Sequence, residues 1–197
     1  MTPLFLGGQP AADFLNTVIS PNGTTVEFIG DGAAFLAWLV EAGLLDADVA
    51  ETLRRRFSAK SLDAAAAEAR EVREWARRWI ARWRVAPHDS YEKEFIALNR
   101  LLKRASTYRA VAPSATGAQM VERYRIESAE DLISLVATEI GLLVTTEDAA
   151  LMKQCMGAGC SLCFLDRTKA HRRMFCSAAL CGNRAKVAAF RERHRSA

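Results

Sequence analysis

The sequence predicts a mainly α-helical protein that carries one small antiparallel β hairpin and ends in a small cysteine-rich module. Three observations support this fold class. Apolar residues recur at helical spacing through most of the first 150 residues. Apolar and polar residues alternate most clearly between Thr107 and Ile126, on either side of a glycine-containing link, as in a hairpin. All five cysteines follow residue 154. We therefore expect two domains, at residues 1–150 and 151–197.

Helix start and stop signals divide the first domain. We expect helices from Pro10 to Val18, Asp31 to Val40, Asp46 to Phe57, Ser61 to Val85 and Ser90 to Lys103. The aspartates that open the second and third segments are the expected N-caps. Pro21–Gly23 predicts a turn, Gly43 ends the second helix and Pro87 ends the fourth. Ser128 caps a further helix that follows the hairpin.

The longest predicted helix carries three tryptophans spaced four residues apart. Trp75, Trp79 and Trp83 form one stripe with Val72. Such a stripe can be a stacking surface for a base or a ligand, but we interpret it as a packed helix face. The arginines on the other side alternate with acidic residues, namely Glu68, Glu71 and Glu74. This alternation predicts a salt-bridged solvent face.

Composition narrows the class of protein. No apolar run reaches the roughly 18 residues of a membrane span, so we expect no membrane association. The first residues have no basic stretch followed by a long apolar one, so we expect no secretory signal and a cytoplasmic protein. An odd number of cysteines without a signal favours metal binding in a reducing compartment over a disulfide framework.

The charge of the chain is distributed unevenly. Residues 167–197 contain nine Lys/Arg and one acidic residue, a net charge of +8. The preceding 166 residues contain 18 basic and 22 acidic side chains, a net charge of −4. An acidic body with a strongly basic tail indicates an anionic partner for the tail. The alternative is a solvated tail that serves only solubility.

The cysteines form two pairs with matched spacing. Cys155 and Cys160 are separated by four residues, as are Cys176 and Cys181, and 15 residues lie between the pairs. Zinc takes four thiolate or imidazole ligands at about 2.3 Å in a tetrahedron. A short loop between two cysteines places both sulfurs on one ion, and the glycines within the first loop and after the second pair permit tight turns. We therefore predict a zinc site.

The spacing alone does not decide which cysteines bind. Cys160 and Cys163 have the commoner two-residue spacing, so the two choices for the first pair are nearly even. Cys163 lies in the apolar stretch Leu162–Leu165, where a free cysteine behaves as a small hydrophobe. His171 is a further candidate, although two cysteine pairs already complete the shell.

The residues around the last cysteine carry a resemblance. Cys181-Gly182-Asn183-Arg184, followed by Ala185-Lys186, resembles the signature of the CGNR zinc-finger family. Agreeing residues are Cys155, Cys160, Phe164–Asp166, Arg172, Arg173, Cys176 and Ser177. Upstream, Asp13–Thr17 and Ala37–Leu45 resemble the ABATE domain that accompanies this finger. Leu162 and Phe175 stand where tryptophan is usual, and both remain apolar.

This resemblance covers nearly the whole chain and implies a fold, a ligand set and a role. It implies a helical ABATE-like domain at residues 1–150, for sensing or dimerisation, and a finger of one β hairpin and a helix at residues 151–197. It implies one structural Zn²⁺ per chain, with an apolar residue aligned at Cys163. The implied ligands are Cys155, Cys160, Cys176 and Cys181. Members of the family are regarded as stress-induced transcription regulators.

The basic tail predicts contacts with double-stranded DNA. A helix from Asn183 to Arg195 would place Val187, Phe190 and His194 on one side, packed on the finger, with cations on both flanks. The expected DNA contacts are Lys169, Arg172, Arg173, Arg184, Lys186, Arg191, Arg193 and Arg195. For Arg184 an internal role, bonding finger carbonyls or Asp166, is equally favoured. Asn183 is interpreted as a cap or turn residue.

Two functional hypotheses follow. The first is a transcription regulator whose body senses a small-molecule signal or forms a homodimer, and whose finger and basic helix bind DNA. The alternative is an adaptor whose zinc module contacts an acidic protein partner without binding DNA. We do not expect an enzyme, because four thiolates would close the zinc shell and no nucleophile–base pair is visible.

Overall fold

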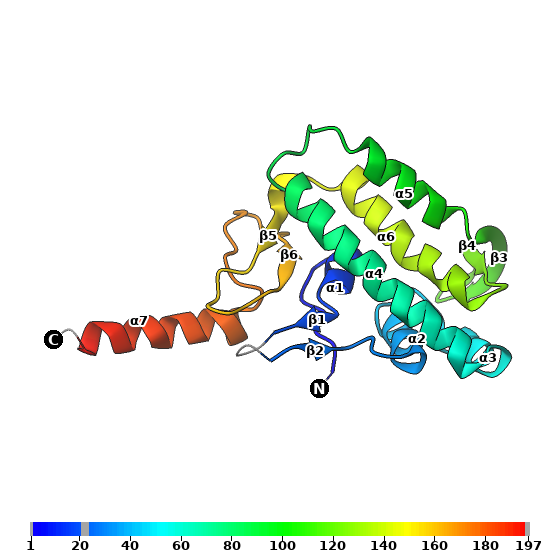
Figure 1. Ribbon diagram of the computed structural model, residues 1–197, viewed down its shortest axis with the longest axis horizontal. Helices are drawn as coiled ribbons and strands as arrows, with labels where there is room; N and C mark the ends of the chain where they lie inside the picture. The colour runs from blue at the N-terminus through cyan, green and yellow to red at the C-terminus, as the bar shows by residue number, and fades with distance from the viewer. Residues whose placement is uncertain (1, 21–23, 196–197) are drawn as a thin grey trace.

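The computed structural model describes residues 2–20 and 24–195. They form a helical body, with the cysteine-rich module at one end and a helix that projects beyond it (Figure 1). The turn predicted at Pro21–Gly23 lies outside the described residues. None of the helices in these two ranges combines the length and the apolar character of a membrane span.

The described elements are mainly helices. The helices are α1 (Pro10–Leu15), α2 (Gly32–Glu41), α3 (Ala47–Arg56), α4 (Ala59–Trp83), α5 (Glu92–Leu102), α6 (Ile133–Thr146) and α7 (Asn183–Arg195), with short turns η2 (Ala129–Leu132), η3 (Ala149–Leu151) and η4 (Ala178–Gly182). The strands are β1 (Val18–Ile19), β2 (Val26–Glu27), β3 (Ser106–Ser114), β4 (Gly117–Arg125), β5 (Met152–Gln154) and β6 (Cys163–Leu165). The strands pair in antiparallel order, β1 with β2, β3 with β4 and β5 with β6. The predicted fold class is confirmed.

Local chemistry explains where the helices begin and end. Asp31 caps α2 by accepting the backbone N–H of Ala34 at 2.8 Å. Gly43 ends that helix with a φ of +71°, which a side chain would disfavour. Asp46 precedes α3 as predicted but makes no side-chain cap, because its carboxylate pairs with Arg123 of β4 at 2.7 Å. The cap predicted at Ser128 is present as a capping box with Asp131, before η2 and α6.

The main core lies where α4 packs on α2 and α6. Trp79 and Trp83 are buried there, and Trp75 is partly buried and packs against the same core. The interpretation of the tryptophan stripe as a packed face is confirmed. The long β3–β4 hairpin is mostly exposed and lies at the opposite end of the molecule from α7 (Figure 1).

One part of the predicted solvent face of α4 is wrong. Arg73 is only 3% exposed, and its guanidinium pairs with both carboxylate oxygens of Glu27 in β2 at 2.7 Å. It also donates to the Thr17 hydroxyl at 2.9 Å. A bidentate pair with one buried partner fixes geometry as well as charge. It holds the β1–β2 hairpin against α4, close to the cysteine-rich module.

Candidate metal centre

The cysteine-rich module shares a hydrophobic core with the N-terminal segment of the chain. The core residues of the module are Cys155, Leu162, Phe164, Cys176 and Cys181. The N-terminal segment adds Leu4, Leu6, Ile19, Val26 and Phe28. A module of some forty residues buries little apolar surface by itself. The N-terminal segment therefore supplies apolar area that the module lacks.

Hydrogen bonds to backbone groups join the N-terminal segment and the cysteine-rich module. The side chain of Asn16 donates to the carbonyl of Cys163 at 2.8 Å and accepts its N–H at 3.0 Å. The N–H of Leu165 in β6 donates to the carbonyl of Gly7 at 2.7 Å. Asn16 is buried, so these bonds are shielded from water. The end of α1 and strand β6 are thus fixed to one another.

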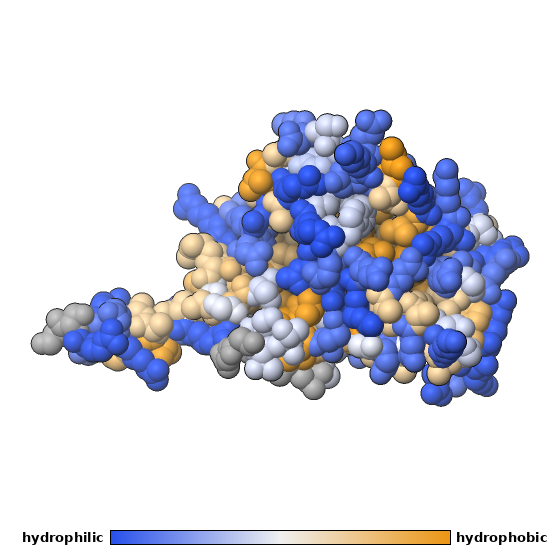
Figure 2. Space-filling model, in the orientation of Figure 1, coloured by the Kyte–Doolittle hydropathy of each residue, from blue (hydrophilic) through white to orange (hydrophobic). Residues whose placement is uncertain are grey.

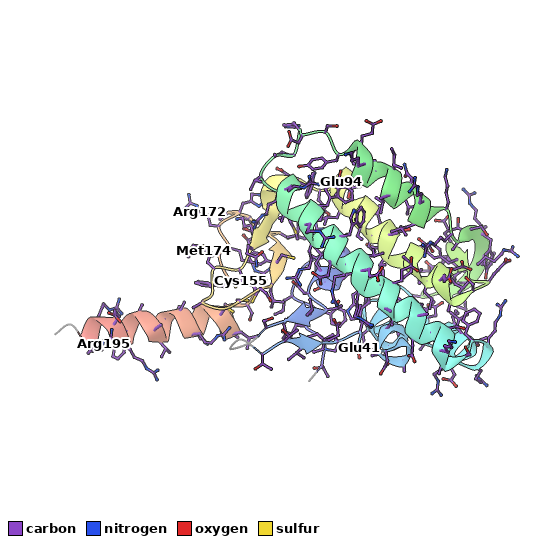
Figure 3. The ribbon with its side chains drawn as sticks, viewed as in Figure 1. Glu41, Glu94, Cys155, Arg172, Met174 and Arg195 are labelled. Atoms are coloured by element: carbon purple, nitrogen blue, oxygen red, sulfur yellow. The ribbon has the colours of Figure 1, made fainter. Side chains whose placement is uncertain are left out.

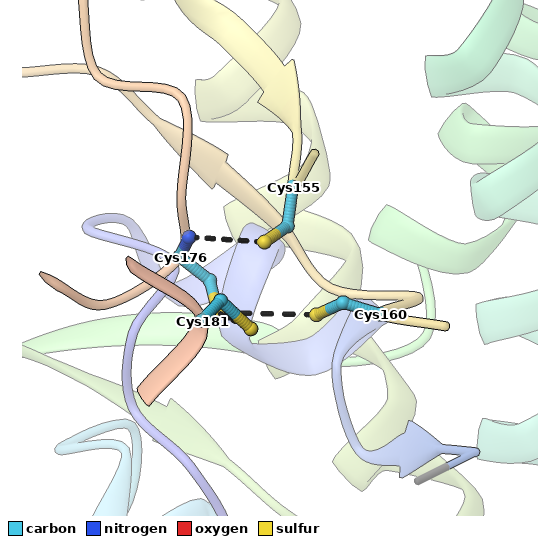
Figure 4. Close-up of side chains that lie close together, drawn as sticks. All are labelled: Cys155, Cys160, Cys176 and Cys181. Atoms are coloured by element: carbon cyan, nitrogen blue, oxygen red, sulfur yellow. Dashed lines mark hydrogen bonds between the residues drawn. The ribbon is translucent and has the colours of Figure 1, made fainter. Parts of the chain in front are cut away.

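Four cysteine side chains converge within the module (Figure 4). Cys155 follows β5, Cys160 lies in the loop before β6, Cys176 precedes η4 and Cys181 lies within η4. Their sulfur atoms all lie within 4.8 Å of one another. The sulfurs of Cys160 and Cys176 are 3.9 Å apart, and those of Cys176 and Cys181 are 3.6 Å apart. Tetrahedral zinc with bonds of about 2.3 Å requires sulfurs about 3.8 Å apart.

Hydrogen-bond donors surround these sulfurs. The Cys155 sulfur accepts the backbone N–H of Cys176 at 3.2 Å and that of Gly157 at 3.4 Å. The guanidinium of Arg184 donates to the Cys181 sulfur at 3.0 Å. Gly157 has no room for a side chain, since a Cβ would lie 2.9 Å from the Cβ of Cys181. Donors of this kind stabilise thiolates and so support a thiolate-bound metal.

The acidities of the thiols show why this group suits a cation. Burial raises the pKa of Cys155, but the N–H donors of Cys176 and Gly157, together with the thiols of Cys160 and Cys176, outweigh it and leave the pKa below its ordinary value. Burial and neighbouring cysteines raise the pKa of Cys160 to about 11 and also raise that of Cys176. Four thiolates at this separation repel one another, and a dication removes the repulsion. The four sulfurs fit one structural zinc ion.

Two other candidate ligands lie outside this group among the residues that the structure describes. Burial raises the pKa of the Cys163 thiol to about 12, and its sulfur lies 3.6 Å from the side-chain oxygen of Asn16. His171 directs Nδ1 to the carbonyl of Asp166 at 3.2 Å. Its φ of +49° is unusual for a residue with a side chain.

Comparison with known families agrees with this architecture. Residues 8–147 match the ABATE family model, which is described as "Putative stress-induced transcription regulator". The chain belongs to the ABATE family. Residues 152–194 match the CGNR zinc finger. The resemblance inferred from the sequence is therefore confirmed. Among curated proteins, none matches the chain.

Asp166 organises the CGNR finger, a role that we did not predict: in the sequence analysis it belongs to the family signature and is an alternative partner for Arg184. Its fully buried carboxylate accepts Lys153 at 2.6 Å, the backbone and hydroxyl of Thr168 at 3.1 and 2.6 Å, and the N–H of Arg173 at 2.9 Å. Burial raises the pKa of Asp166, but these donors outweigh it and hold the pKa well below its usual range. The carboxylate closes the loop between the two cysteine pairs.

Two of the cations predicted to contact DNA have internal partners in the finger. Arg184 donates to the sulfur of Cys181, as described above. Arg173 donates to the carbonyls of Leu6 at 3.2 Å, Phe175 at 2.9 Å and Cys176, and its guanidinium lies 4.2 Å from the ring centre of Phe164. These arginines therefore support the metal centre and its junction with the ABATE domain.

The remaining predicted DNA-contact residues are exposed. These are Lys169, Arg172, Lys186, Arg191, Arg193 and Arg195. Arg195 pairs with Glu192 on the surface at 3.1 Å. The space-filling view shows hydrophilic side chains along the projecting helix (Figure 2).

The predicted packing of α7 on the finger is wrong. Val187 is 49% exposed and Phe190 is 54% exposed, because α7 points away from the finger after its first turns. His194 instead stacks on Phe190, with the ring centres 4.0 Å apart. The start of α7 borders an apolar groove of about 680 Å³. The groove is also lined by Leu4, Ile19, Leu162 and Leu180.

Proposed function

We propose that this ABATE-family protein is a transcription regulator that binds duplex DNA through α7 and the basic loop of its CGNR finger. The observation that carries the proposal is the position of α7. The helix begins two residues after the zinc ligand Cys181, has no buried residue and exposes Lys186, Arg191 and Arg193. Its 13 residues span about 20 Å, and the DNA major groove is about 12 Å wide.

The charge distribution supports the same interface. Arg172 and Arg195 lie on the side of the finger that faces away from the helical body (Figure 3). Lys169 is exposed in the same loop as Arg172. Phosphate contacts need cations that are free to reach the backbone of DNA. Because Arg173 and Arg184 have internal partners, we assign the phosphate contacts to the loop and to α7.

The test is the salt dependence of binding by the zinc-loaded chain. With about four to six phosphates contacted, log affinity should fall against log salt with a slope of about −4 to −5. The triple variant Arg191→Gln, Arg193→Gln, Arg195→Gln should lower that slope by about two to three and weaken binding to all sequences alike. The matched control, Arg78→Gln, Arg100→Gln, Arg109→Gln, removes the same charge from the body and should change the slope little.

The apolar groove favours a second candidate function. A groove of about 680 Å³ beside exposed arginines suits an acidic, amphipathic protein segment. In that case the chain is a zinc-dependent adaptor. Zinc-loaded protein that shows no salt-sensitive binding to a random pool of duplexes would exclude the DNA proposal and leave the adaptor.

The role of the zinc, the cellular compartment and the role of the ABATE domain are the same in both candidate functions. We infer that the zinc is structural and non-catalytic, because four thiolates leave no open position for a substrate. We also place the protein in the cytoplasm, where thiols stay reduced. The ABATE domain then serves to sense a small-molecule signal or to form a homodimer.

A further inference from the structure

A small pocket lies at the junction between the ABATE domain and the CGNR finger. The C-terminal end of α4 reaches the β5–β6 hairpin at this junction (Figure 1). The pocket encloses about 50 Å³. Its polar lining comes from Arg77 of α4, Arg84 at the C-cap of α4, Gln154 of β5 and Ser161 of the zinc loop, and Cys163 adds a thiol. Two positively charged side chains and one hydroxyl-bearing side chain therefore line the same pocket where the two domains join.

Arg77 of α4 and Arg84, the C-cap residue of that helix, are partly buried and lack partners among the described residues. Arg78 also lacks one, but it is exposed to water. Arg73 and Arg82 pair with Glu27 and Glu94. Arg77 and Arg84 have neither a side-chain hydrogen bond nor an ion pair to any residue in 2–20 or 24–195. A guanidinium presents five N–H donors, and leaving them unused in a partly buried position is costly.

Two unsatisfied atoms mark the same pocket. Arg84 Nε and Ser161 Oγ each expose less than 1 Å² and have no hydrogen-bond partner within the described ranges. Only one other side-chain atom there shares this state, Nε1 of Trp79, and Trp79 does not line the pocket. Buried polar atoms are almost always satisfied, so two such atoms in one pocket indicate a missing acceptor.

The field in the pocket is positive. Burial raises the pKa of Cys163 to about 12, while the charges of Arg77 and Arg84 act to lower it. Both guanidiniums therefore lie close enough to act on the same pocket atom. Asp13 acts in the opposite direction, so two guanidiniums and one carboxyl group act on this thiol. The pocket itself lacks a carboxylate among its lining residues.

We propose that this pocket binds a small oxyanion, either a free inorganic ion or the carboxylate or phosphate group of a small molecule. Arg77 and Arg84 supply charged N–H donors, and the Ser161 hydroxyl supplies a neutral one. Guanidiniums bind planar carboxylates and tetrahedral phosphates through paired hydrogen bonds. A buried water needs about 10–15 Å³ of such space, so 50 Å³ admits a group of only a few atoms.

The position of the pocket gives the anion a structural consequence. Arg77 and Arg84 belong to the ABATE domain, whereas Ser161 is adjacent to the zinc ligand Cys160. A bound anion bridges these two parts and stabilises their junction. This bridge is independent of what α7 binds. A change in DNA affinity caused by the anion rests additionally on the proposed function.

Direct binding to the zinc-loaded full chain tests the site. Inorganic phosphate, sulfate, acetate and formate are each titrated by calorimetry at constant ionic strength, with chloride as the balancing ion. We expect saturable binding of one ion per chain in at least one class, with a rise in Tm as the ion concentration passes Kd. Comparing the affinities for phosphate and sulfate with those for acetate and formate shows whether the site prefers a tetrahedral or a planar anion. Saturation by none of the four overturns the proposal.

Variants separate this site from general charge screening. Arg77→Gln and Arg84→Gln should each weaken the best ion about ten- to hundredfold, and Ser161→Ala several-fold, since charged donors contribute more than neutral ones. The control Arg78→Gln removes the same charge from an exposed position on the same helix and should retain the affinity. Equal losses in Arg78→Gln and Arg84→Gln would mean screening only and would reject the site.

A second measurement distinguishes a binding role from a structural one. In anion-free buffer Arg84→Gln should leave Tm unchanged or raise it, because the variant removes an unpaired charge. A fall of several degrees with retained zinc would show that Arg84 holds the fold and would contradict the proposal. Anion binding without any DNA binding would support the site while excluding the proposed function, so the two failures are distinguishable.

Discussion

The helical body and the zinc finger of this chain are held together by different means. The body buries continuous apolar helix faces, with Trp79, Phe35 and Leu132 among its fully buried side chains. Up to residue 195 the finger consists of two short strands, the short turn η4 and one exposed helix, and three of its buried core residues are cysteines. The body can meet the entropy of folding by apolar burial, whereas the finger needs a metal and residues from another part of the chain.

The largest expected effect comes from removing a zinc ligand. Cys181→Ala should abolish stoichiometric zinc, because structural zinc contributes about 10–16 kcal/mol in small fingers. Elemental analysis of purified protein should fall from about one zinc per chain to near zero. Cys163→Ala is the matched control and should retain the metal, because its sulfur lies outside the group of four. Zinc lost from Cys163→Ala and kept in Cys155→Ala would contradict the ligand set.

Removal of the metal sharpens the comparison between the two regions. Chelation should leave most of the helical circular dichroism, since α2 to α6 have their own core. It should also remove hydrogen-exchange protection from the finger and from the N-terminal residues that share its core, such as Ile19 and Phe28. Protection that persists at these two residues after chelation would show that the N-terminal segment does not depend on the finger.

This shared core could not be predicted from the sequence. The periodicity of the apolar residues and the capping residues placed the helices well, and α7 has the predicted bounds of Asn183 and Arg195. Those signals are local, since each depends on residues within a turn or two. The pairing of Leu4 and Ile19 with cysteines more than 130 residues away leaves no periodic pattern in either segment.

The long side chains were equally hard to assign. The sequence shows that Arg73, Arg173 and Arg184 are charged but not what their guanidiniums reach. Each can extend several ångströms in any direction, so the tertiary structure decides between a carboxylate, a carbonyl, a thiolate and solvent. The resemblance of Asp13–Thr17 to the ABATE motif was a sequence signal on the body side of the junction. The structure gives that motif a physical role, since Asp13 bonds Gly7 and Asn16 bonds Cys163.

The junction itself can be broken at Asn16. Asn16→Ala removes both hydrogen bonds to the backbone of Cys163 and leaves buried polar groups unsatisfied. We expect a loss of about 2–4 kcal/mol in the free energy of unfolding. Urea denaturation of the zinc-loaded chain measures this loss. Asn99→Ala, an exposed position on α5, is the matched control and should cost less than about 0.5 kcal/mol. Equal losses in the two variants would show that the junction contributes nothing specific.

A smaller effect is expected on the zinc affinity when Arg184, a donor to a ligand sulfur, is replaced. Arg184→Gln removes the guanidinium that donates to the Cys181 sulfur. Zinc should remain bound, but its affinity should fall about ten- to hundredfold, as for other donors to metal ligands. Competition with a chromophoric chelator measures the change, and Arg191→Gln controls for the charge. Unchanged zinc affinity with lost DNA discrimination would instead make Arg184 a base-reading residue.

The smallest expected effect is a pH-dependent change in stability that comes from Asp13, on the body side of the junction. Burial raises the pKa of Asp13 to about 6 from its ordinary value of 3.8, although N–H groups of Gly7 and Leu6 act to lower it. The folded state therefore holds the proton more tightly than the unfolded state. The stability that this difference contributes is fully present below about pH 4 and is lost as the pH rises through about 6.

Asp13→Asn isolates the contribution of Asp13 ionisation to stability. The amide side chain is uncharged, and its oxygen can still accept the N–H of Gly7. The variant should be more stable than the parent at pH 7.5, by up to about 2 kcal/mol after allowance for solvent screening, and the advantage should shrink toward pH 5. Comparing the two chains at each pH cancels the loss of zinc affinity that both share on acidification. Asp89→Asn, in an exposed loop, is the control and should show no such trend. A stability difference between Asp13→Asn and the parent that does not change between pH 5 and 7.5 would mean that Asp13 is ionised throughout, and that the junction accommodates a carboxylate at no cost.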